Sequence, residues 1–239
     1  NDNTIRSKLY IEEIQPAFNE LVDKIVYTYK FTSLENVDVL KDDCKVWLTT
    51  ILSKFDPKQG GGGRMALDYG YHVFSLAMHL FGDVEKVFAW ITEQKILHDW
   101  VLDSPAMMIW KYRNSERYGN WDVVSSDEIL VPTKYWPEDE WVEISGTKGF
   151  LWANRCTSML LDRPPLVMVR DGVTTDFSNF DTDFASSFVR GTHDWIAALM
   201  EGRQASQSGA EGKRVTQFCR AAQLSAREHR EVSLDEIDS

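Results

Sequence analysis

The sequence has few cysteines and no long apolar run. Its three cysteines, Cys44, Cys156 and Cys219, are far apart and odd in number, so they suggest neither a disulfide framework nor a Cys-x-x-Cys metal site. No stretch approaches the roughly 20 apolar residues that span a bilayer, and the first residues lack the pattern of a signal peptide. We therefore expect buried free thiols, no metal, no membrane partner and, by default, a cytoplasmic location.

Basic residues are also scarce. The chain has 26 Lys and Arg against 37 Asp and Glu, a formal net charge of −11, and no cluster of basic residues. This distribution disfavours nucleic acid as a partner. With 239 residues, 43% of them hydrophobic, the chain is long enough to bury a sizeable core. No internal boundary is evident, and we expect one domain over residues 1–239.

The most informative segment is GGGGRMALDYGYHVFSLAMHLFG, residues 60–82. If it forms a helix, Asp68 and His72 project from one face, one turn apart. A carboxylate at that spacing can orient an imidazole, which can then take a proton from a substrate hydroxyl near neutral pH. On its own the pair is more typical of a helix-surface Asp and His, or of a core histidine, than of a catalytic pair. Gly70 between them indicates a packing or functional reason, because a helix interior seldom accepts glycine.

The same glycines superficially imitate a nucleotide-binding turn. Gly61, Gly63 and Ala66 satisfy G-x-G-x-x-A, which in a βαβ unit cradles a pyrophosphate. The preceding residues DPKQ, however, break any strand that would feed the turn. Asp68 would also place a negative charge beside the pyrophosphate. We reject a dinucleotide fold at this position.

Hydrophobic periodicity gives a coarse secondary structure. Residues 12–23 have the pattern of a short helix, residues 21–32 alternate like a strand, and residues 33–56 fit either. A helix is expected over 64–81, ending at Gly82 as a left-handed cap. Strands are expected over residues 86–93, 106–112, 120–127, 141–146, 149–154 and 166–170.

Two helices are expected near the end of the chain. Ser208 and Glu211 form a capping box at the start of the second. Apolar residues recur at helical spacing in both, which indicates core packing: Phe184, Phe188, Trp195 and Leu199, then Val215, Phe218, Ala222 and Ala226. Strands followed by helices predict an α+β fold in which a mostly antiparallel open sheet has helices packed on one face.

The other face of that sheet is expected to be aromatic. Five aromatic residues lie on predicted strands, and helices on one face cannot cover them all: Trp90, Trp110, Tyr112, Trp121 and Trp152. An exposed aromatic surface marks an association site more often than a solvent face. We therefore expect a homodimer or homotetramer formed through the open sheet face.

Several segments resemble one enzyme family. GGGGRMALDYGYH followed by VFSLAMHLFGDVEKVFAWI resembles the D-x-G-x-H helix and following strand of the glucose-fructose oxidoreductase, inositol dehydrogenase and MocA-like family. WVEISGTKGFLWAN resembles its E-x-x-G-t-x-G strand pair, and the chain from DWIAALMEGR onward is similar to its two closing helices and final segment. The resemblance runs from about Ile14 to the end and is weakest over residues 35–56. It implies the C-terminal substrate-binding and oligomerisation domain of an NAD(P)-dependent oxidoreductase.

Two features of the family are missing from this chain. The family has an N-terminal Rossmann domain with a glycine fingerprint, and a Glu-Lys-Pro segment whose lysine joins the Asp and His in catalysis. The chain has no Glu-Lys-Pro and begins at Asn1 without an initiator methionine. We expect a C-terminal half, inactive alone, of an enzyme that binds NAD or NADP mainly through the missing domain.

The resemblance assigns roles to particular residues. His72 would be the general base in hydride transfer between nicotinamide and a sugar, polyol or related small hydroxy compound, and Asp68 would hold its imidazole. Tyr69 and Tyr71 would shape the substrate pocket, and the cofactor would approach the glycine run. Further candidates follow: Gly62 and Gly63 for cofactor binding, and Lys148, Arg155 and His193 for substrate binding.

Other functions remain open alternatives. The chain could belong to a non-catalytic dinucleotide or sugar sensor, or could serve as an oligomerisation scaffold of the same fold. The presence of both Asp68 and His72 weighs against a sensor, which needs no paired acid and base. The remaining histidines, His79, His98 and His229, have no partner pattern and are expected to be structural or on the surface.

Overall fold

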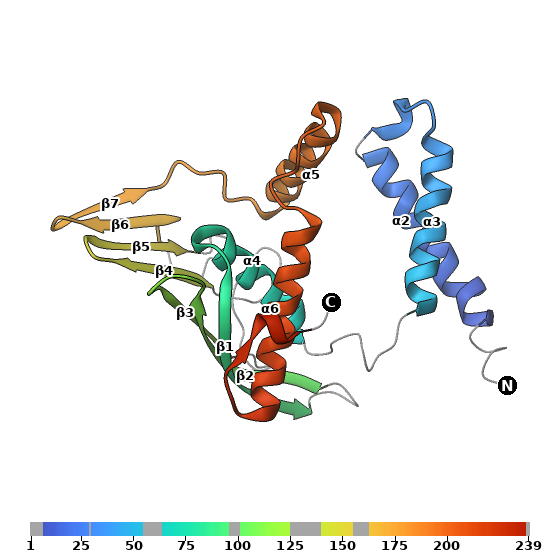
Figure 1. The fold of residues 1–239 in the computed structure, drawn as a ribbon. Helices are drawn as coiled ribbons and strands as arrows, with labels where there is room; N and C mark the ends of the chain where they lie inside the picture. Colours follow the sequence, from blue (N-terminus) through green and yellow to red (C-terminus); the bar gives the residue numbers. More distant parts are fainter. Residues whose placement is uncertain are drawn as a thin grey trace. The chain divides into compact units, whose positions relative to one another are not determined.

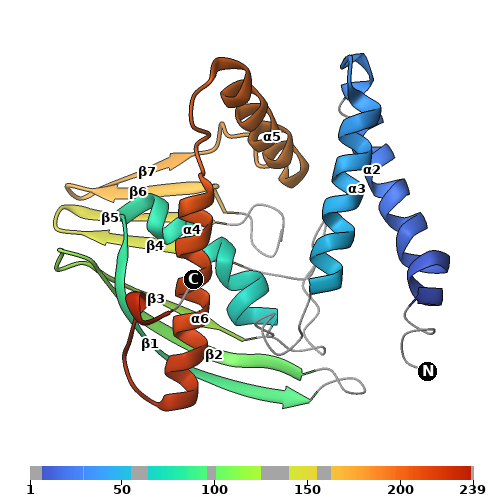
Figure 2. The same cartoon turned by 45° about the vertical axis from the view of Figure 1, so that its right-hand side comes forward.

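The computed structural model describes residues 7–28, 30–54, 64–95, 101–124, 140–154 and 163–237 (Figures 1 and 2). The chain forms two compact units, residues 1–62 and residues 63–239. We expected no internal boundary, whereas the structure places one at the end of the glycine run. Each unit is built around its own packed elements.

The described residues of the first unit form helices, apart from the turn residue Lys30 and the turn over residues 34–36. Its elements are η1 (Tyr10–Ile14), α2 (Gln15–Thr28), the short 3₁₀ turn η2 (Phe31–Ser33) and α3 (Val37–Lys54). Helix α2 packs against α3 (Figure 1), and the Tyr10 hydroxyl lies 2.5 Å from the Thr49 hydroxyl.

The strand predicted over residues 21–32 is therefore wrong. Val22 and Val26, four residues apart, are the buried residues of α2, while Lys24 between them is exposed. An alternating strand would place all three on one face, so the packing follows the helical period. The β-branched residues favour a strand locally, but packing of the two helices overrides that preference. Residues 33–56, which fitted either type, are helical from Val37 to Lys54.

The second unit has helices and antiparallel sheets, as the sequence predicts. Its strands form two four-stranded sheets and not one, in the orders β3-β2-β1-β8 and β4-β5-β6-β7. The elements in chain order are η3 (Arg64–Tyr69), α4 (Gly70–Phe81), β1 (Val84–Lys95), β2 (Val101–Tyr112), β3 (Tyr118–Val123), β4 (Trp141–Gly146), β5 (Gly149–Asn154), β6 (Leu166–Arg170), β7 (Val173–Phe177), α5 (Phe184–Glu201), α6 (Gly209–Glu228), β8 (Val232–Ser233) and η4 (Leu234–Glu236).

The main hydrophobic core lies between the first sheet and helices α4 and α6. Phe218 of α6 is fully buried and stacks on Phe74 of α4, with ring centroids 3.9 Å apart. Trp110 of β2 meets the Phe218 ring edge-on at 5.4 Å. These three aromatic rings join α4, α6 and the sheet, so the core fixes the position of α4.

The opposite face of the first sheet is apolar and exposed. Phe88 of β1 is opposite Ile109 of β2, and Trp90 is opposite Met107. Trp90 is 55% exposed, and Met107 and Ile109 are also exposed. Trp110 and Tyr112, by contrast, are buried and Trp121 packs against the core. The aromatic residues of this sheet thus divide between its two faces.

A glycine lies directly under the buried tryptophan of β2. Gly119 of β3 is opposite Trp110 in the ladder, and a Cβ atom at Gly119 would lie 2.5 Å from the indole atom Cε2. Because glycine has no side chain, residue 119 leaves room for the large indole ring of Trp110 to pack against the backbone of β3.

The apolar stripes of helices α5 and α6 differ in burial. The stripe of α6 is in the core as predicted, because Val215, Phe218 and Ala222 are buried and Ala226 packs on them. The core packing predicted for α5 is wrong: its exposed apolar residues include Phe188, Trp195 and Leu199. The predicted capping box is present, since Ser208 Oγ accepts from the N–H of Glu211 and the Glu211 carboxylate accepts from the N–H of Ser208.

Two strands were not predicted from the sequence, β7 and the two-residue β8. Strand β7 (Val173–Phe177) follows β6 through a two-residue turn at Asp171 and Gly172, both with positive φ, 52° and 77°. Asp-Gly is the sequence signal of such a hairpin. Each strand that we predicted in the second unit corresponds to a strand of the structure, with bounds that agree or differ by a few residues.

Candidate active site

Asp68 and His72 lie on one continuous helical segment, which begins as a π-helix and continues as an α-helix. Asp68 is in the π-helical turn η3, and His72 is in the α-helix α4, with the junction between Tyr69 and Gly70. A single helix type was predicted. A π-turn is rare and occurs often at functional sites, and here it lies at the predicted catalytic pair.

The inner face of this segment is buried in the core. Ala66 and Phe74 are fully buried and Met65 nearly so. A Cβ atom at Gly70 would lie 3.1 Å from the Phe74 ring and 3.3 Å from the Met65 carbonyl oxygen. Gly70 therefore has the packing role that its place in the helix suggested, since it allows the turn to pack closely.

The outer face presents the predicted pair to solvent. Asp68, Tyr71 and His72 are exposed, and Tyr69 is half-buried. The Tyr71 and His72 rings lie 4.0 Å apart between centroids, tilted by 36°. Within the described residues no hydrogen bond or ion pair joins Asp68 to His72. Both side chains are thus open to a ligand, and the contact between them is not formed in this structure.

Both ends of the segment are held by buried or half-buried carboxylates. At its start Asp103 of β2, a residue that the sequence reading missed, accepts hydrogen bonds from the backbone N–H groups of Met65 and Ala66, each at 2.7 Å. At its end, α4 stops at Gly82, whose φ of 91° and ψ of −166° lie outside the left-handed helical region that we expected.

Asp83, which follows Gly82, is bonded to two arginines. Arg214 Nε and Arg113 Nε donate to its carboxylate at 2.7 and 2.9 Å. Burial raises the pKa of Asp83, but the hydrogen bonds from Arg214 and Arg113 outweigh it, so its pKa lies below the ordinary value. The carboxylate is therefore charged at neutral pH and ties the end of α4 to α6 and to the residue that follows β2.

The other predicted substrate residues are not brought to the pair. Lys148 is exposed in the turn between β4 and β5, and His193 is exposed on α5. In the part of the chain that the structure describes, neither contacts Asp68 or His72 through a hydrogen bond, ion pair or ring contact. Arg155, Gly62 and Gly63 lie outside the described residues. All of these assignments stay predictions.

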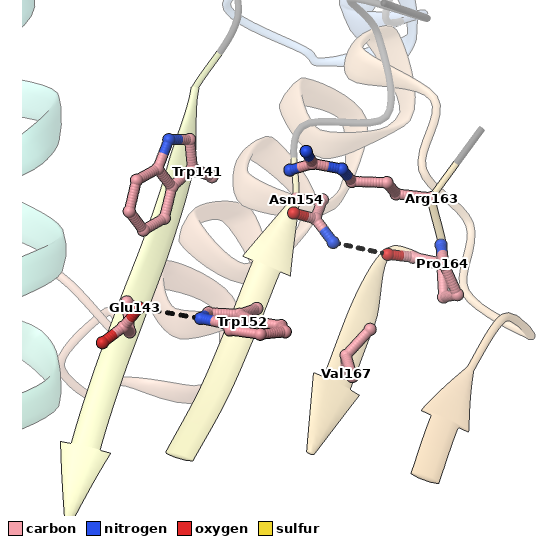
Figure 3. Close-up of a pocket in the computed structure, with 7 residues that line it drawn as sticks. All are labelled: Trp141, Glu143, Trp152, Asn154, Arg163, Pro164 and Val167. Carbon is pink, nitrogen blue, oxygen red and sulfur yellow. Dashed lines mark hydrogen bonds between the residues drawn. The ribbon is translucent and has the colours of Figure 1, made fainter. Parts of the chain in front are cut away.

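A separate open hollow of about 490 Å³ lies on the second sheet (Figure 3). The Trp152 indole N–H donates to the Glu143 carboxylate at 2.8 Å, and the Asn154 side-chain amide donates to the Pro164 carbonyl at 2.8 Å. Its lining residues are Trp141, Glu143, Trp152, Asn154, Arg163, Pro164 and Val167. None belongs to the helical segment that carries Asp68 and His72.

Within the described ranges the chain has neither a metal-binding cluster nor a membrane-spanning helix. No group of three or more His, Cys, Asp or Glu side chains there is arranged to hold a metal ion. No helix there has the length and apolar character needed to cross a membrane.

Comparison with known proteins links the chain to oxidoreductases. The model of a family described as "Oxidoreductase family, C-terminal alpha/beta domain" matches residues 52–234. The resemblance that we drew from about Ile14 thus extends further toward the N-terminus than the matched region. No curated protein is significantly similar in sequence.

Solved structures share the fold at low sequence identity. They include an oxidoreductase from Agrobacterium radiobacter in complex with NAD+, L-tartaric acid and magnesium (20% identity, TM-score 0.54, covering 70% of this chain and 48% of that chain). A probable dehydrogenase from Thermotoga maritima has 22% identity, a TM-score of 0.53 and coverage of 74% and 51%. Levoglucosan dehydrogenase in complex with NADH and levoglucosan has 19% identity, a TM-score of 0.55 and coverage of 70% and 49%. The chain spans about half the length of these structures.

Proposed function

The chain belongs to the glucose-fructose oxidoreductase, inositol dehydrogenase and MocA-like oxidoreductase family through its C-terminal alpha/beta domain, and on that premise we propose that it is the substrate-side domain of a longer NAD(P)-dependent oxidoreductase. Its substrate would be a sugar, polyol or related small hydroxy compound. The observation that carries the proposal is the exposed Asp68 and His72 on the outer face of a helix whose inner face is fixed in the core.

In the reaction that we propose, His72 acts as the general base. A ring nitrogen of His72 accepts the proton of the substrate hydroxyl while hydride leaves the same carbon for nicotinamide, and the carbon–oxygen single bond becomes a carbonyl. Asp68 holds the imidazole in orientation and stabilises its charged form. The two side chains are not bonded in this structure, and catalytic hydrogen bonds often tighten only when substrate is bound.

The residues present in this chain fit the proton transfer of this reaction. An imidazole and a carboxylate at an open helix face can take up a proton, and nicotinamide, when bound, supplies the hydride acceptor. Backbone at Gly62 and Gly63 would allow close approach of the cofactor, because glycine has no side chain to block it. The exposed ring of Tyr71 beside His72 would form one wall of the substrate pocket.

Turnover by the longer protein tests the proposal. We expect it to form reduced nicotinamide from NAD or NADP with at least one compound of a panel of sugars, polyols and hydroxy acids, followed by nicotinamide absorbance. If no compound is turned over, but a dinucleotide or sugar binds in a direct binding assay, the protein is a sensor and the proposal is wrong.

We also propose that the exposed face of the first sheet joins copies of this chain. Phe88, Trp90, Met107 and Ile109 are cross-strand neighbours there, and exposed apolar patches of this kind mark protein contacts. Burying each aromatic ring removes a large apolar area from water. A homodimer or homotetramer formed through this face would cover it.

Replacing Trp90 by Glu tests that interface. We expect wild type to sediment as a dimer or tetramer, and Trp90→Glu to shift the protein toward monomer, because a buried unpaired charge opposes association. Trp195→Glu on α5 is the matched control, since both tryptophans are 55% exposed, and it should leave assembly unchanged. A monomeric wild type, or dissociation by Trp195→Glu alone, contradicts the proposal.

A further inference from the structure

The helical segment that carries Asp68 and His72 begins without a local cap. The first N–H groups of a helix have no partner within it, and a Ser, Thr, Asp or Asn just before the helix usually accepts from them. Here the four residues before Arg64 are glycines, Gly60–Gly63, which have no side-chain acceptor. A side-chain acceptor must therefore come from elsewhere in the chain.

Asp103 supplies it from the neighbouring sheet. Its Oδ1 accepts from the N–H of Met65 and its Oδ2 from the N–H of Ala66, both at 2.7 Å, across 38 and 37 residues of sequence. Hydrogen bonds to an ionised acceptor are short and strong, and a negative charge is favoured at the start of a helix. Both oxygens of the carboxylate are thus used.

The position of Asp103 is itself fixed. Asp103 is 5% exposed, its neighbours Leu102 and Ser104 are buried, and in the ladder it is opposite Glu93 of β1. No Lys or Arg forms an ion pair with it in the part of the chain that the structure describes. A buried carboxylate needs compensation, and the two backbone N–H groups provide it here.

The two residues of the pair depend on different anchors. Asp68 lies in the π-turn η3, within three residues of the N–H groups that Asp103 holds. His72 lies in α4, one turn from the junction and close to Phe74, which is fully buried. A change at the start of η3 would therefore move Asp68 relative to His72 while leaving His72 in place.

A π-turn also needs such an anchor. It is less common than the α-helix, and the glycines before it lower its stability through their backbone freedom. Without the carboxylate, the N–H groups of Met65 and Ala66 lose their acceptor in a buried place, and the turn would fray or rewind to regular α-helix. Either change alters the direction of the Asp68 side chain.

We propose that Asp103 is a positioning residue for the pair: by holding the N–H groups of Met65 and Ala66, it sets the direction in which Asp68 faces His72. The inference rests on the proposed function for its effect on catalysis. A carboxylate that merely capped the helix would affect stability alone, whereas a positioning carboxylate acts on the reaction through Asp68.

The test compares Asp103→Asn with Asp103→Glu and a control in the longer protein. Asp103→Asn keeps the shape but loses the charge and one acceptor, and we expect kcat to fall about 10- to 100-fold with KM changed by less than about threefold. Asp103→Glu keeps the charge but lengthens the side chain, and we expect an intermediate loss. Asp176→Asn on β7 is the control, because Asp176 is exposed, and it should behave as wild type.

A double-mutant cycle separates positioning from simple capping. In an Asp68→Asn background, Asp103→Asn should lower kcat by less than about twofold while its loss of stability persists, because coupled residues are not additive. Full additivity in kcat would overturn the proposal even if wild-type catalysis is confirmed.

A second measurement on the 239-residue chain does not need turnover. In NMR spectra we expect Asp103→Asn to speed amide exchange at Met65 and Ala66 and to change the nuclear Overhauser contacts that the Asp68 side chain makes with its neighbours on the helical segment. Unchanged contacts of the Asp68 side chain would overturn the positioning role. Absence of turnover in wild type would instead count against the proposed function alone. If Asp103→Asn does not fold, Asp103→Glu is measured in the same way.

Discussion

Replacing His72 by Ala is expected to lower kcat of the longer protein by about 10²- to 10⁴-fold, the usual contribution of a general base. Without the imidazole, the hydroxyl proton must leave to water while hydride leaves the carbon. KM should change little, because the imidazole acts on a proton that moves in the transition state. The measurement is steady-state turnover with the substrate found in the panel, for wild type, His72→Ala and His72→Asn.

His79→Ala is the matched control. His79 is exposed on the same helix α4, so it reports the effect of removing an imidazole from that helix without removing the proposed base. We expect turnover at the wild-type level. If His72→Ala retains wild-type kcat, or if His79→Ala loses as much, the general base is not His72.

The largest expected effect on stability comes from Phe218→Ala. The Phe218 ring is fully buried, stacked on Phe74 at 3.9 Å and edge-on to Trp110 at 5.4 Å. Removing it leaves a cavity between three elements, and such changes lower the free energy of unfolding by about 3–5 kcal/mol. Because the cavity adjoins α4, the helix that carries His72 loses part of its support.

Denaturant unfolding of the 239-residue chain measures this loss. Phe188→Ala on α5 is the control, because Phe188 is 56% exposed, and we expect a change in the free energy of unfolding of less than about 0.5 kcal/mol. Equal losses in the two variants would mean that the core described here is not what stabilises the fold.

The periodicity of apolar residues in the sequence predicted most helices and strands of the second unit. The stripe of α6 is a good example, because Val215, Phe218 and Ala222 follow the helical period and also face the sheet. The stripe of α5 has the same period, but Phe188 and Trp195 are exposed. Periodicity shows that a helix has an apolar face and does not show which surface covers that face.

In the first unit, a sequence pattern that predicts a strand belongs to a helix. The alternation from Leu21 onward predicts a strand, yet Val22 and Val26 are buried together on a helix. β-Branched residues bias a segment toward strand only weakly when a second helix offers a packing surface. The sequence carries both patterns, and the packing of α2 on α3 decides between them.

The candidate site was predictable in part. The spacing of Asp68 and His72 places both on one helical segment, which the structure confirms. The π-turn and the role of Asp103 were not predictable, because hydrogen bonds across 37 and 38 residues leave no local pattern. The one signal in the sequence was an absence, since the four glycines before the helix have no side-chain acceptor for its first N–H groups.

The packing of Trp110 on Gly119 constrains how this sequence can change over time. Any side chain at residue 119 would collide with the indole 2.5 Å away, so that position is closed to substitution as long as the tryptophan is retained. A smaller residue at 110 opens it, but first leaves a void in the core. Either change alone therefore destabilises the core, and we expect substitutions at residues 110 and 119 to accompany each other.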